Sequence, residues 1–376
     1  MPEPFKNFFN PELIKAMAGH LARQSTRFDA PRFREHALNG LDALELKQRS
    51  NQITDALCIS LPDDFRSACS ILVNALHPED DVDLSELTTD ARGLRGWAIM
   101  PMADFVARKG LDDFDHGMDV LKEMTKRMSA EFAVRPFIAA DAERAMRHVK
   151  RWARDPNYHV RRLASEGSRP RLPWGLRLNE FVADPEPILP VLETLRDDPE
   201  EYVRRSVANS LNDIAKDHPD LVAEIAGDWL SGDPGKERQR LVRHACRSLI
   251  KAGHRPTLKA LGYGQASVAL ENLSINNETI RVGEALRIRA ELRSTATSDQ
   301  DLIVDYVVHH RKANGGTSPK VFKWKAVRLA AGESLVLEKS HSMRPVTTRT
   351  YYGGQHVIEI QANGKRLGEQ AFTLVL

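Results

Sequence analysis

Two carboxylates, Glu166 and Asp213, stand among arginines in segments whose apolar residues recur at helical spacing. Arg162 precedes Glu166 by four residues, and Asp213 shares one helix face with Arg205 and Asn209. Residues four apart on a helix are neighbours, and an ion pair at this spacing contributes only about 0.2–0.5 kcal/mol. A carboxylate on a basic surface also opposes phosphate binding. The arrangement therefore favours a ligand that carries local positive charge, which an acid would stabilise.

A rigid loop follows Glu166. The helical pattern ends there, and Ser168–Gly175 contains two prolines, so the helix cannot continue. This loop carries Trp174 close to Arg169 and Arg171. A tryptophan beside arginines can stack on a base or a sugar. The alternative is that Trp174 fills the seam between two packed helical segments.

The candidate residues lie in a repeated helical unit. The segment that begins at Asp155 aligns with the one that begins at Asp198, with Asp, Pro, Val and two arginines in register at a period of 43 residues. This period is typical of HEAT and armadillo repeats, in which helical hairpins stack into a solenoid with a concave surface. A degraded copy follows Asp233, and an earlier copy over Met128–Ile138 places Glu131 near the expected concave surface.

Basic residues are concentrated along this helical part. Ten Lys and Arg lie between Arg144 and Arg177 against two acids, and eight lie between Lys236 and Lys259 against one. Such a track is the footprint expected for a phosphate backbone, although helical repeats also carry solvated basic residues. The candidates for DNA contacts are Lys150, Arg151, Arg161, Arg162, Arg169, Arg171, Arg204, Arg205, Arg243 and Arg247.

The pattern changes to alternation near residue 267. Seven short segments with alternating apolar residues, separated by turn sequences such as Asn314-Gly315, fit an immunoglobulin-like β-sandwich. The predicted fold class is therefore multidomain, α then β, with an α-solenoid of HEAT-like repeats followed by this sandwich. We expect a helical domain over residues 1–262 and a sandwich domain over residues 267–376.

Composition excludes several other classes of protein. The 376 residues carry 54 Lys and Arg against 52 Asp and Glu, a net charge of +2 that hides the basic track behind acids such as those of Pro78–Asp90. Three scattered cysteines, Cys58, Cys69 and Cys246, predict neither a disulfide framework nor a zinc site. No apolar run approaches the length of a membrane span, so we expect a cytoplasmic protein without metal or cofactor.

The block Arg161–Gly175 resembles the signature of the AlkC branch of the AlkC/AlkD-type DNA glycosylases. The opening Glu3–Asn10 and the repeat over Asp198–Asp213 are similar to that family as well, and the sandwich matches members with an Ig-like domain. The resemblance thus covers nearly the whole chain.

The resemblance implies base-excision repair of alkylated DNA. Such enzymes hydrolyse the N-glycosidic bond of cationic bases such as 3-methyladenine and 3-methylcytosine, are monofunctional, and do not flip the base into a pocket. It implies catalytic roles for Glu166, Asp213, Trp174 and Glu131, with the carboxylates stabilising an oxocarbenium-like sugar. The expected partner is double-stranded DNA that contains alkylated bases, bound by a monomer associated with the nucleoid.

Two other functions are consistent with the same architecture. A non-catalytic HEAT scaffold explains the repeats but does not explain why acids and a loop tryptophan lie within basic clusters. An architectural DNA-binding protein explains the basic clusters without assigning a role to the acids.

Overall fold

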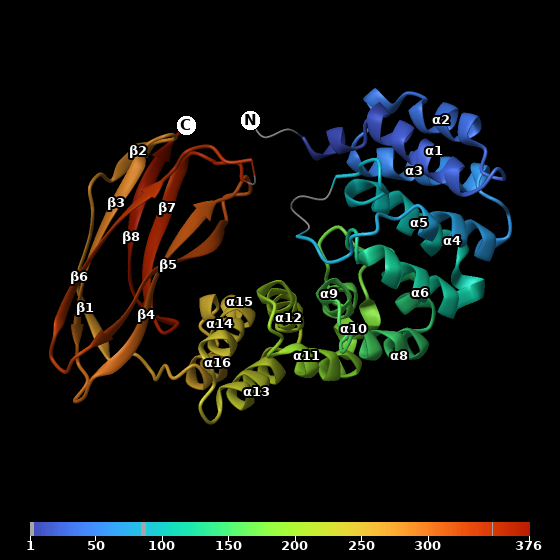
Figure 1. Cartoon of the computed structure of the whole chain (residues 1–376). Coiled ribbons are helices and arrows are strands. Elements are labelled where there is room, and N and C mark those ends of the chain that lie inside the picture. Colours follow the sequence, from blue (N-terminus) through green and yellow to red (C-terminus); the bar gives the residue numbers. More distant parts are fainter. Residues whose placement is uncertain (1–3, 84–87, 348) are drawn as a thin grey trace. The chain divides into compact units, whose positions relative to one another are not determined.

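The computed structural model describes residues 4–83, 88–347 and 349–376 (Figure 1). Glu3 of the amino-terminal block and residues 84–87 of the acidic stretch lie outside the described residues. The chain forms two compact units, Met1–Asp217 and His218–Leu376. Within the described residues, no helix is both long and apolar enough to span a membrane.

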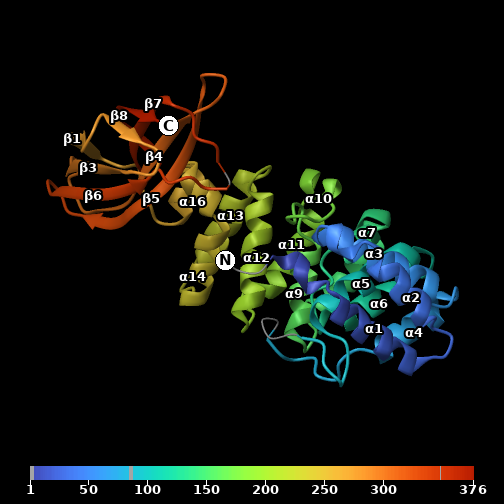
Figure 2. The same cartoon turned by 90° about the horizontal axis from the view of Figure 1, so that it is seen from above.

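The first unit is helical (Figures 1 and 2). Asn10 and Asp64 begin helices as N-caps, each accepting a hydrogen bond from the backbone N–H three residues later. Its α-helices are α1 (Pro11–Gln24), α2 (Ala30–Leu38), α3 (Leu46–Ser60), α4 (Phe65–Asn74), α5 (Ile99–Lys109), α6 (Phe114–Thr125), α7 (Val134–Ala140), α8 (Ala142–Trp152), α9 (Tyr158–Gly167), α10 (Asn179–Ala183), α11 (Leu189–Leu195) and α12 (Glu201–Ile214). Short 3-10 turns lie at Phe5–Phe8, Leu41–Ala43, Gly96–Ala98, Leu111–Asp113 and Glu186–Ile188.

The two aligned sequence segments correspond to α9 and α12, which pack against each other. The same arginine braces the turn before each helix. Arg161 donates to the carbonyls of the Asp155-Pro156 pair, and Arg204 donates to those of the Asp198-Pro199 pair. The repeated Asp-Pro pair and the first arginine of each Val-Arg-Arg are thus explained by one local structure. That the helix pairs form HEAT-like repeats stays a prediction.

The second unit begins with α13 (Pro219–Leu230), α14 (Lys236–Ala245), α15 (Arg247–Lys251) and α16 (Arg255–Ala260). Its strands are β1 (Val268–Ile275), β2 (Thr279–Arg281), β3 (Ala285–Ser294), β4 (Gln300–Arg311), β5 (Thr317–Leu329), β6 (Ser334–Ser342), β7 (Gly354–Ala362) and β8 (Lys365–Val375). A three-stranded sheet has the order β1-β3-β6, and a five-stranded sheet has the order β2-β8-β7-β4-β5. Alternate residues of both sheets, such as Ile288 and Val304, form one buried core.

The predicted fold class, helices followed by an immunoglobulin-like sandwich, is confirmed. Each of the seven predicted segments contributes a strand, while β2 was not predicted because it has only three residues and pairs in parallel with β8. The last helix ends at Ala260 and the first strand begins at Val268. The second compact unit nevertheless includes α13–α16, since α15 contacts β5 and the backbones of Gly253 and Gly364 touch.

Candidate active site

Glu166 and Asp213 are brought together across the α9–α12 contact by Arg169. Nη1 of Arg169 lies 2.6 Å from Oε1 of Glu166, and its Nη2 lies 2.8 Å from Oδ2 of Asp213. All three residues are buried, with 5%, 2% and 6% of Glu166, Asp213 and Arg169 exposed. On the outer side, Lys216 contacts the other oxygen of Asp213 at 3.1 Å. Arg169 therefore holds two carboxylates close together that would otherwise repel.

Arg162 links Glu131 to the same group. Its Nη1 donates to Oε2 of Glu131 at 2.7 Å, and its Nη2 lies 3.6 Å from Oε1 of Glu166. Ser129 donates a second hydrogen bond to Glu131, and the guanidinium carbon of Arg162 lies 4.5 Å from the ring centroid of Tyr202. We call Glu131, Arg162, Glu166, Arg169 and Asp213 the acid–arginine chain, because acids and arginines alternate along it.

Burial and opposite charge compete at Glu166. Burial alone would raise the pKa of this carboxyl, but the guanidinium groups of Arg162 and Arg169 together lower it below its ordinary value. Oε2 of Glu166 is buried and accepts no hydrogen bond of normal geometry from the described residues, although the hydroxyl of Ser206, which donates to Ser165, lies close enough to help lower the pKa of Glu166. Glu166 is thus an ionised carboxylate with one oxygen left to accept a hydrogen bond or to face a cation.

Trp174 lies in the loop between α9 and α10 and points away from the core. It is 69% exposed, so it does not fill a seam between helices, whereas Trp152 is 3% exposed and belongs to the core. Its backbone has a φ of +64°, which is unusual for a residue with a side chain. Lys47 of α3 donates to the Trp174 carbonyl at 2.6 Å and so holds this conformation.

Arg135 also holds this loop in place through hydrogen bonds. It is fully buried and donates to the carbonyls of Gly167 and Leu176, on either side of Trp174. Burial, together with the nearby charge of Arg169, lowers the pKa of Arg135 to about 10. The sequence contains no pattern that identifies Arg135 or Lys47, because both act on backbone carbonyls more than 30 residues away.

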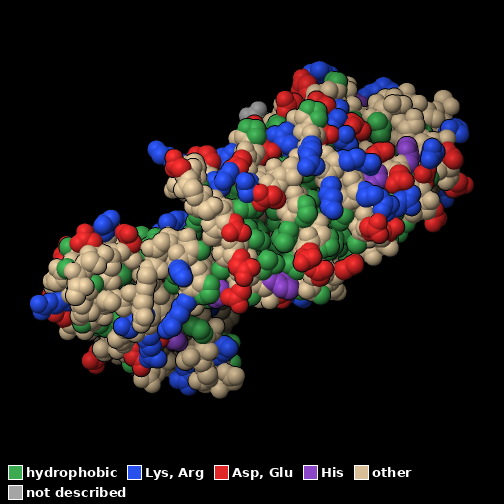
Figure 3. Space-filling view, turned by 90° about the horizontal axis from the view of Figure 1, so that it is seen from below, with side chains coloured by type: hydrophobic (Ala, Val, Ile, Leu, Met, Phe, Trp, Pro, Cys, Tyr) green, Lys and Arg blue, Asp and Glu red, His purple; other side chains and the backbone are tan. Residues whose placement is uncertain are grey.

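Many of the predicted DNA-contacting arginines are paired with acids. Arg161 binds Asp198 at 2.6 Å and Arg171 binds Asp217 at 2.7 Å. Arg169 and Arg162 belong to the acid–arginine chain, and Arg204 braces the turn before α12. On the face shown in Figure 3, basic and acidic side chains are likewise interspersed. The basic track of the sequence is therefore partly neutralised by acids from distant positions.

Other candidates for DNA contacts remain on the surface. Lys150, Arg151, Arg205 and Arg243 are exposed, and Arg247 is half-buried. Arg151 donates to His148, Arg243 donates to Tyr263, and Arg247 donates to the His244 carbonyl. Lys150 and Arg205 form no ion pair among the described residues. Their role as DNA contacts stays a prediction.

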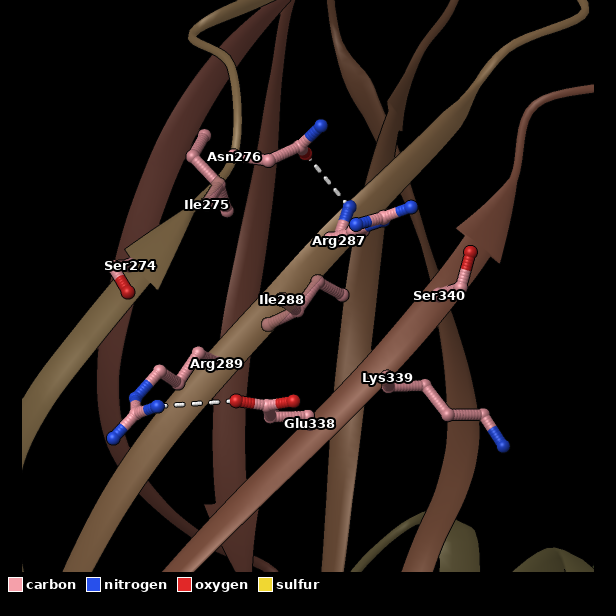
Figure 4. Close-up of a pocket in the computed structure, with 9 residues that line it drawn as sticks. All are labelled: Ser274, Ile275, Asn276, Arg287, Ile288, Arg289, Glu338, Lys339 and Ser340. Carbon is pink, nitrogen blue, oxygen red and sulfur yellow. Dashed lines mark hydrogen bonds and ion pairs between the residues drawn. The ribbon is translucent and has the colours of Figure 1, made fainter.

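The second unit carries a hollow of about 520 Å³ on its three-stranded sheet (Figure 4). Arg289 lies 3.1 Å from Glu338 across this hollow, and the backbone N–H of Arg287 donates to Asn276. The side chains of Arg289 and Glu338 thus satisfy each other. Among the described residues, no group of three or more His, Cys, Asp or Glu could hold a metal ion.

Two family models match the sequence of this chain and indicate its class of protein. Residues 124–248 match the model described as "DNA alkylation repair enzyme". Residues 269–376 match "Uncharacterised protein YhaZ, C-terminal Ig-like domain". The first range contains the whole acid–arginine chain and Trp174.

Relatives that align with nearly the whole chain identify its family within this class. The chain is 34% identical to "Uncharacterized protein YhaZ" of Bacillus subtilis (strain 168) over 362 residues, 96% of each protein. It is also similar to the solved structure of the Pseudomonas fluorescens alkylpurine DNA glycosylase AlkC bound to DNA containing an abasic site analog. That match has a TM-score of 0.89 and 37% identity and covers 100% of both chains. The chain belongs to this AlkC family, as the sequence resemblance indicated.

Proposed function

We propose that the chain is a monofunctional DNA glycosylase that hydrolyses the N-glycosidic bond of cationic alkylated bases. The observation that carries this proposal is the acid–arginine chain, which holds three carboxylates together, one of them on the helix that precedes the loop of the exposed Trp174. The relative AlkC is an alkylpurine DNA glycosylase bound to DNA with an abasic site analog, and an abasic site is what removal of a base leaves.

The carboxylates suit the charge that develops during this reaction. As the bond between C1′ and the base nitrogen breaks, its electron pair neutralises the cationic base and positive charge moves to the sugar. The free oxygen of Glu166 is a fixed acceptor for that charge, and Asp213 adds a second negative group. Water then adds to C1′ and gives its proton to a carboxylate or to solvent.

The expected substrates are 3-methyladenine and 3-methylcytosine in double-stranded DNA. Both bases are positively charged when alkylated in DNA and so leave without strong acid catalysis. The exposed indole of Trp174 can pack against a cationic nucleotide from the surface. A surface contact of this kind does not require that the base be flipped into a pocket before cleavage.

The test is to incubate the protein with methylated duplex DNA and to identify the released bases by mass spectrometry. We expect free 3-methyladenine and 3-methylcytosine, with abasic sites left in an unbroken strand. A strand cut at the abasic site would contradict the monofunctional assignment. Tight DNA binding without base release would favour an architectural DNA-binding protein, and neither binding nor release would favour a protein-binding scaffold.

A further inference from the structure

A pocket of about 340 Å³ lies beside the acid–arginine chain but is separate from it. It is lined by one face of α3, by α5, by Phe132 and by the loop residue Trp174. Phe132 directly follows Glu131 in the sequence, and Trp174 and Gly175 belong to the loop that follows Arg169, so three lining residues connect the pocket to the elements of the proposed site of bond cleavage. Its volume is in the range of small-molecule pockets.

One wall of the pocket is a fixed aromatic ring. Trp97 lines it and stacks on Phe8, with ring centroids 5.0 Å apart and an interplanar angle of 7°. Phe9 packs edge-on against the same indole at 5.6 Å. The amino-terminal Phe-Phe pair therefore fixes Trp97, and Met100 and Phe132 add further apolar surface. A wall of this kind suits a flat ring that can stack.

The pocket also contains two polar groups with few partners. Asp104 and Ser50 both line it, and Ser50 is 1% exposed. The hydroxyl of Ser50 makes no hydrogen bond of normal geometry with any described residue. Burial raises the pKa of Asp104 to about 6, although Arg108, the neighbouring Ser50 and Lys47 act to lower it. A buried hydroxyl and a half-buried carboxyl that lie close to each other form a polar group in an otherwise apolar pocket, and they indicate a ligand with a polar edge.

The cations near the pocket are engaged elsewhere. Lys47 donates to the Trp174 carbonyl. Arg108 donates to Asp55 and to the amide oxygen of Asn51. Asp104 is therefore the charged group best placed to meet a ligand. A carboxyl accepts hydrogen bonds from amino groups, and a stacked indole favours planar, electron-poor rings.

We infer that this pocket binds the alkylated base after its release, and that it selects bases with an exocyclic amino group. The inference rests on the proposed function. Trp97 and Phe132 would contact the faces of the ring, and Asp104 and Ser50 would bind its amino edge. Because the pocket adjoins the acid–arginine chain, the base has only a short distance to move once its bond to the sugar is broken. The base enters after cleavage, so no flipping precedes the reaction.

The test measures binding of free bases to the full-length protein by calorimetry, without DNA. The probes are 3-methylcytosine and 3-methyluracil, which share a ring and a methyl position and differ where an exocyclic nitrogen is replaced by oxygen. We expect 3-methylcytosine to bind about tenfold more tightly or better, because a hydrogen bond to a charged group is worth about 1.5–3 kcal/mol. The same free base should inhibit excision from methylated DNA.

Variants connect binding to the named residues. Asp104→Asn and Ser50→Ala should each weaken 3-methylcytosine binding about tenfold and leave 3-methyluracil binding unchanged. Asp112→Asn is the matched control, because Asp112 is an exposed acid that does not line the pocket. Thermal unfolding of each variant shows whether it is folded, and Ser50→Ala, a small change, carries the test if Asp104→Asn unfolds.

The inference is overturned if the two bases bind equally, if neither binds, or if folded Asp104→Asn and Ser50→Ala bind as the wild type does. Excision is measured separately on the same preparations. Normal excision without base binding would contradict the inference that the pocket binds the base, but it would support the proposed glycosylase function. Absence of excision counts against the proposed function, whatever the free bases do.

Discussion

Arg169 lies between Glu166 and Asp213 and donates a hydrogen bond to a carboxylate oxygen of each, at 2.6 and 2.9 Å. The three groups are buried, so each acid depends on this one guanidinium for much of its compensation. A buried charge that loses its partner is strongly destabilising, because its lost hydration is no longer compensated. Arg169 is therefore expected to position the two carboxylates, in addition to any contact with DNA.

We predict that Arg169→Gln lowers the free energy of unfolding by about 3–5 kcal/mol. Urea unfolding followed by tryptophan fluorescence measures the change. Arg171→Gln is the matched control, since Arg171 forms its ion pair with Asp217 at the surface, where solvent screens the charges, and its loss should cost much less. Equal losses of stability in the two variants would show that the buried ion pairs of Arg169 contribute no more to the free energy of unfolding than the surface ion pair of Arg171.

Glu166→Gln and Asp213→Asn should each reduce the single-turnover rate of 3-methyladenine release by about 100-fold or more. Both substitutions keep the size of the side chain and remove its negative charge. Affinity for duplex DNA, measured by fluorescence anisotropy, should change little, since neither acid attracts phosphate. Glu143→Gln, which alters an exposed acid paired with Arg147, should leave the rate unchanged. Wild-type rates in both site variants would remove these acids from the mechanism.

The sequence was sufficient to place the acids on the correct elements. Helical spacing and the 43-residue period put Glu166 and Asp213 on α9 and α12, which pack together. It could not show that Arg169 points inward to these acids, because its partner Asp213 lies 44 residues away. Charge patterning along a chain reports composition, whereas ion pairing depends on which helices touch. The same reason explains why Arg161 and Arg171 appeared as free basic residues.

The sequence also did not show where two distant parts of the backbone come into contact. Gly253 and Gly364 are separated by more than 100 residues, and nothing in either neighbourhood marks their contact. The sequence showed where the helical pattern changes to a strand pattern. It did not show that the second compact unit begins earlier, at His218. Local periodicity determines the type of an element, but long-range contacts decide which elements form one unit.

Trp174→Ala should reduce excision about tenfold without lowering the melting temperature. The indole is 69% exposed, so it contributes little to the core, whereas stacking of an aromatic side chain on a base is worth about 1–3 kcal/mol. Trp174→Phe retains an aromatic face and should restore most of the activity. Differential scanning fluorimetry and the single-turnover assay test both statements. A large loss of stability, or no loss of excision, would contradict the proposed contact with DNA.

Acid should weaken the second unit through His310. This residue is 3% exposed, and burial, together with the nearby charge of Arg349, lowers its pKa from 6.5 to about 3. Between these values the unfolded chain binds a proton that the folded chain does not. Stability is therefore fully present above pH 6.5 and falls as the pH is lowered toward 3.

By pH 4.5 the loss attributable to His310 is on the order of 2 kcal/mol, once the shift is discounted for solvent screening. It can be measured by urea unfolding at pH 7, 5.5 and 4.5 in the wild type and in His310→Phe, which cannot be protonated. The variant should lose less stability on acidification. The neighbouring His341, whose pKa burial lowers to about 4, will keep part of the dependence in both proteins. Parallel pH profiles would mean that His310 is not responsible.

The contact between Gly253 and Gly364 should make the second unit intolerant of a side chain at either position. A Cβ on Gly253 would lie 2.6 Å from the Cα of Gly364, and a Cβ on Gly364 would lie 2.3 Å from the Cα of Gly253. Both residues also have positive φ, at 67° and 71°. Gly253→Ala and Gly364→Ala should each reduce the free energy of unfolding by about 2–4 kcal/mol, the sum of backbone strain and overpacking.

Gly262→Ala separates these two causes. Gly262 has a φ of 84°, but nothing lies within 4 Å of its added Cβ, so only the backbone strain of about 1–2 kcal/mol applies. Urea unfolding of the three variants measures the difference that the close approach makes. If the alanine variants at positions 253 and 364 were no less stable than the one at position 262, the helices α13–α16 would not depend on this contact with the β7–β8 turn.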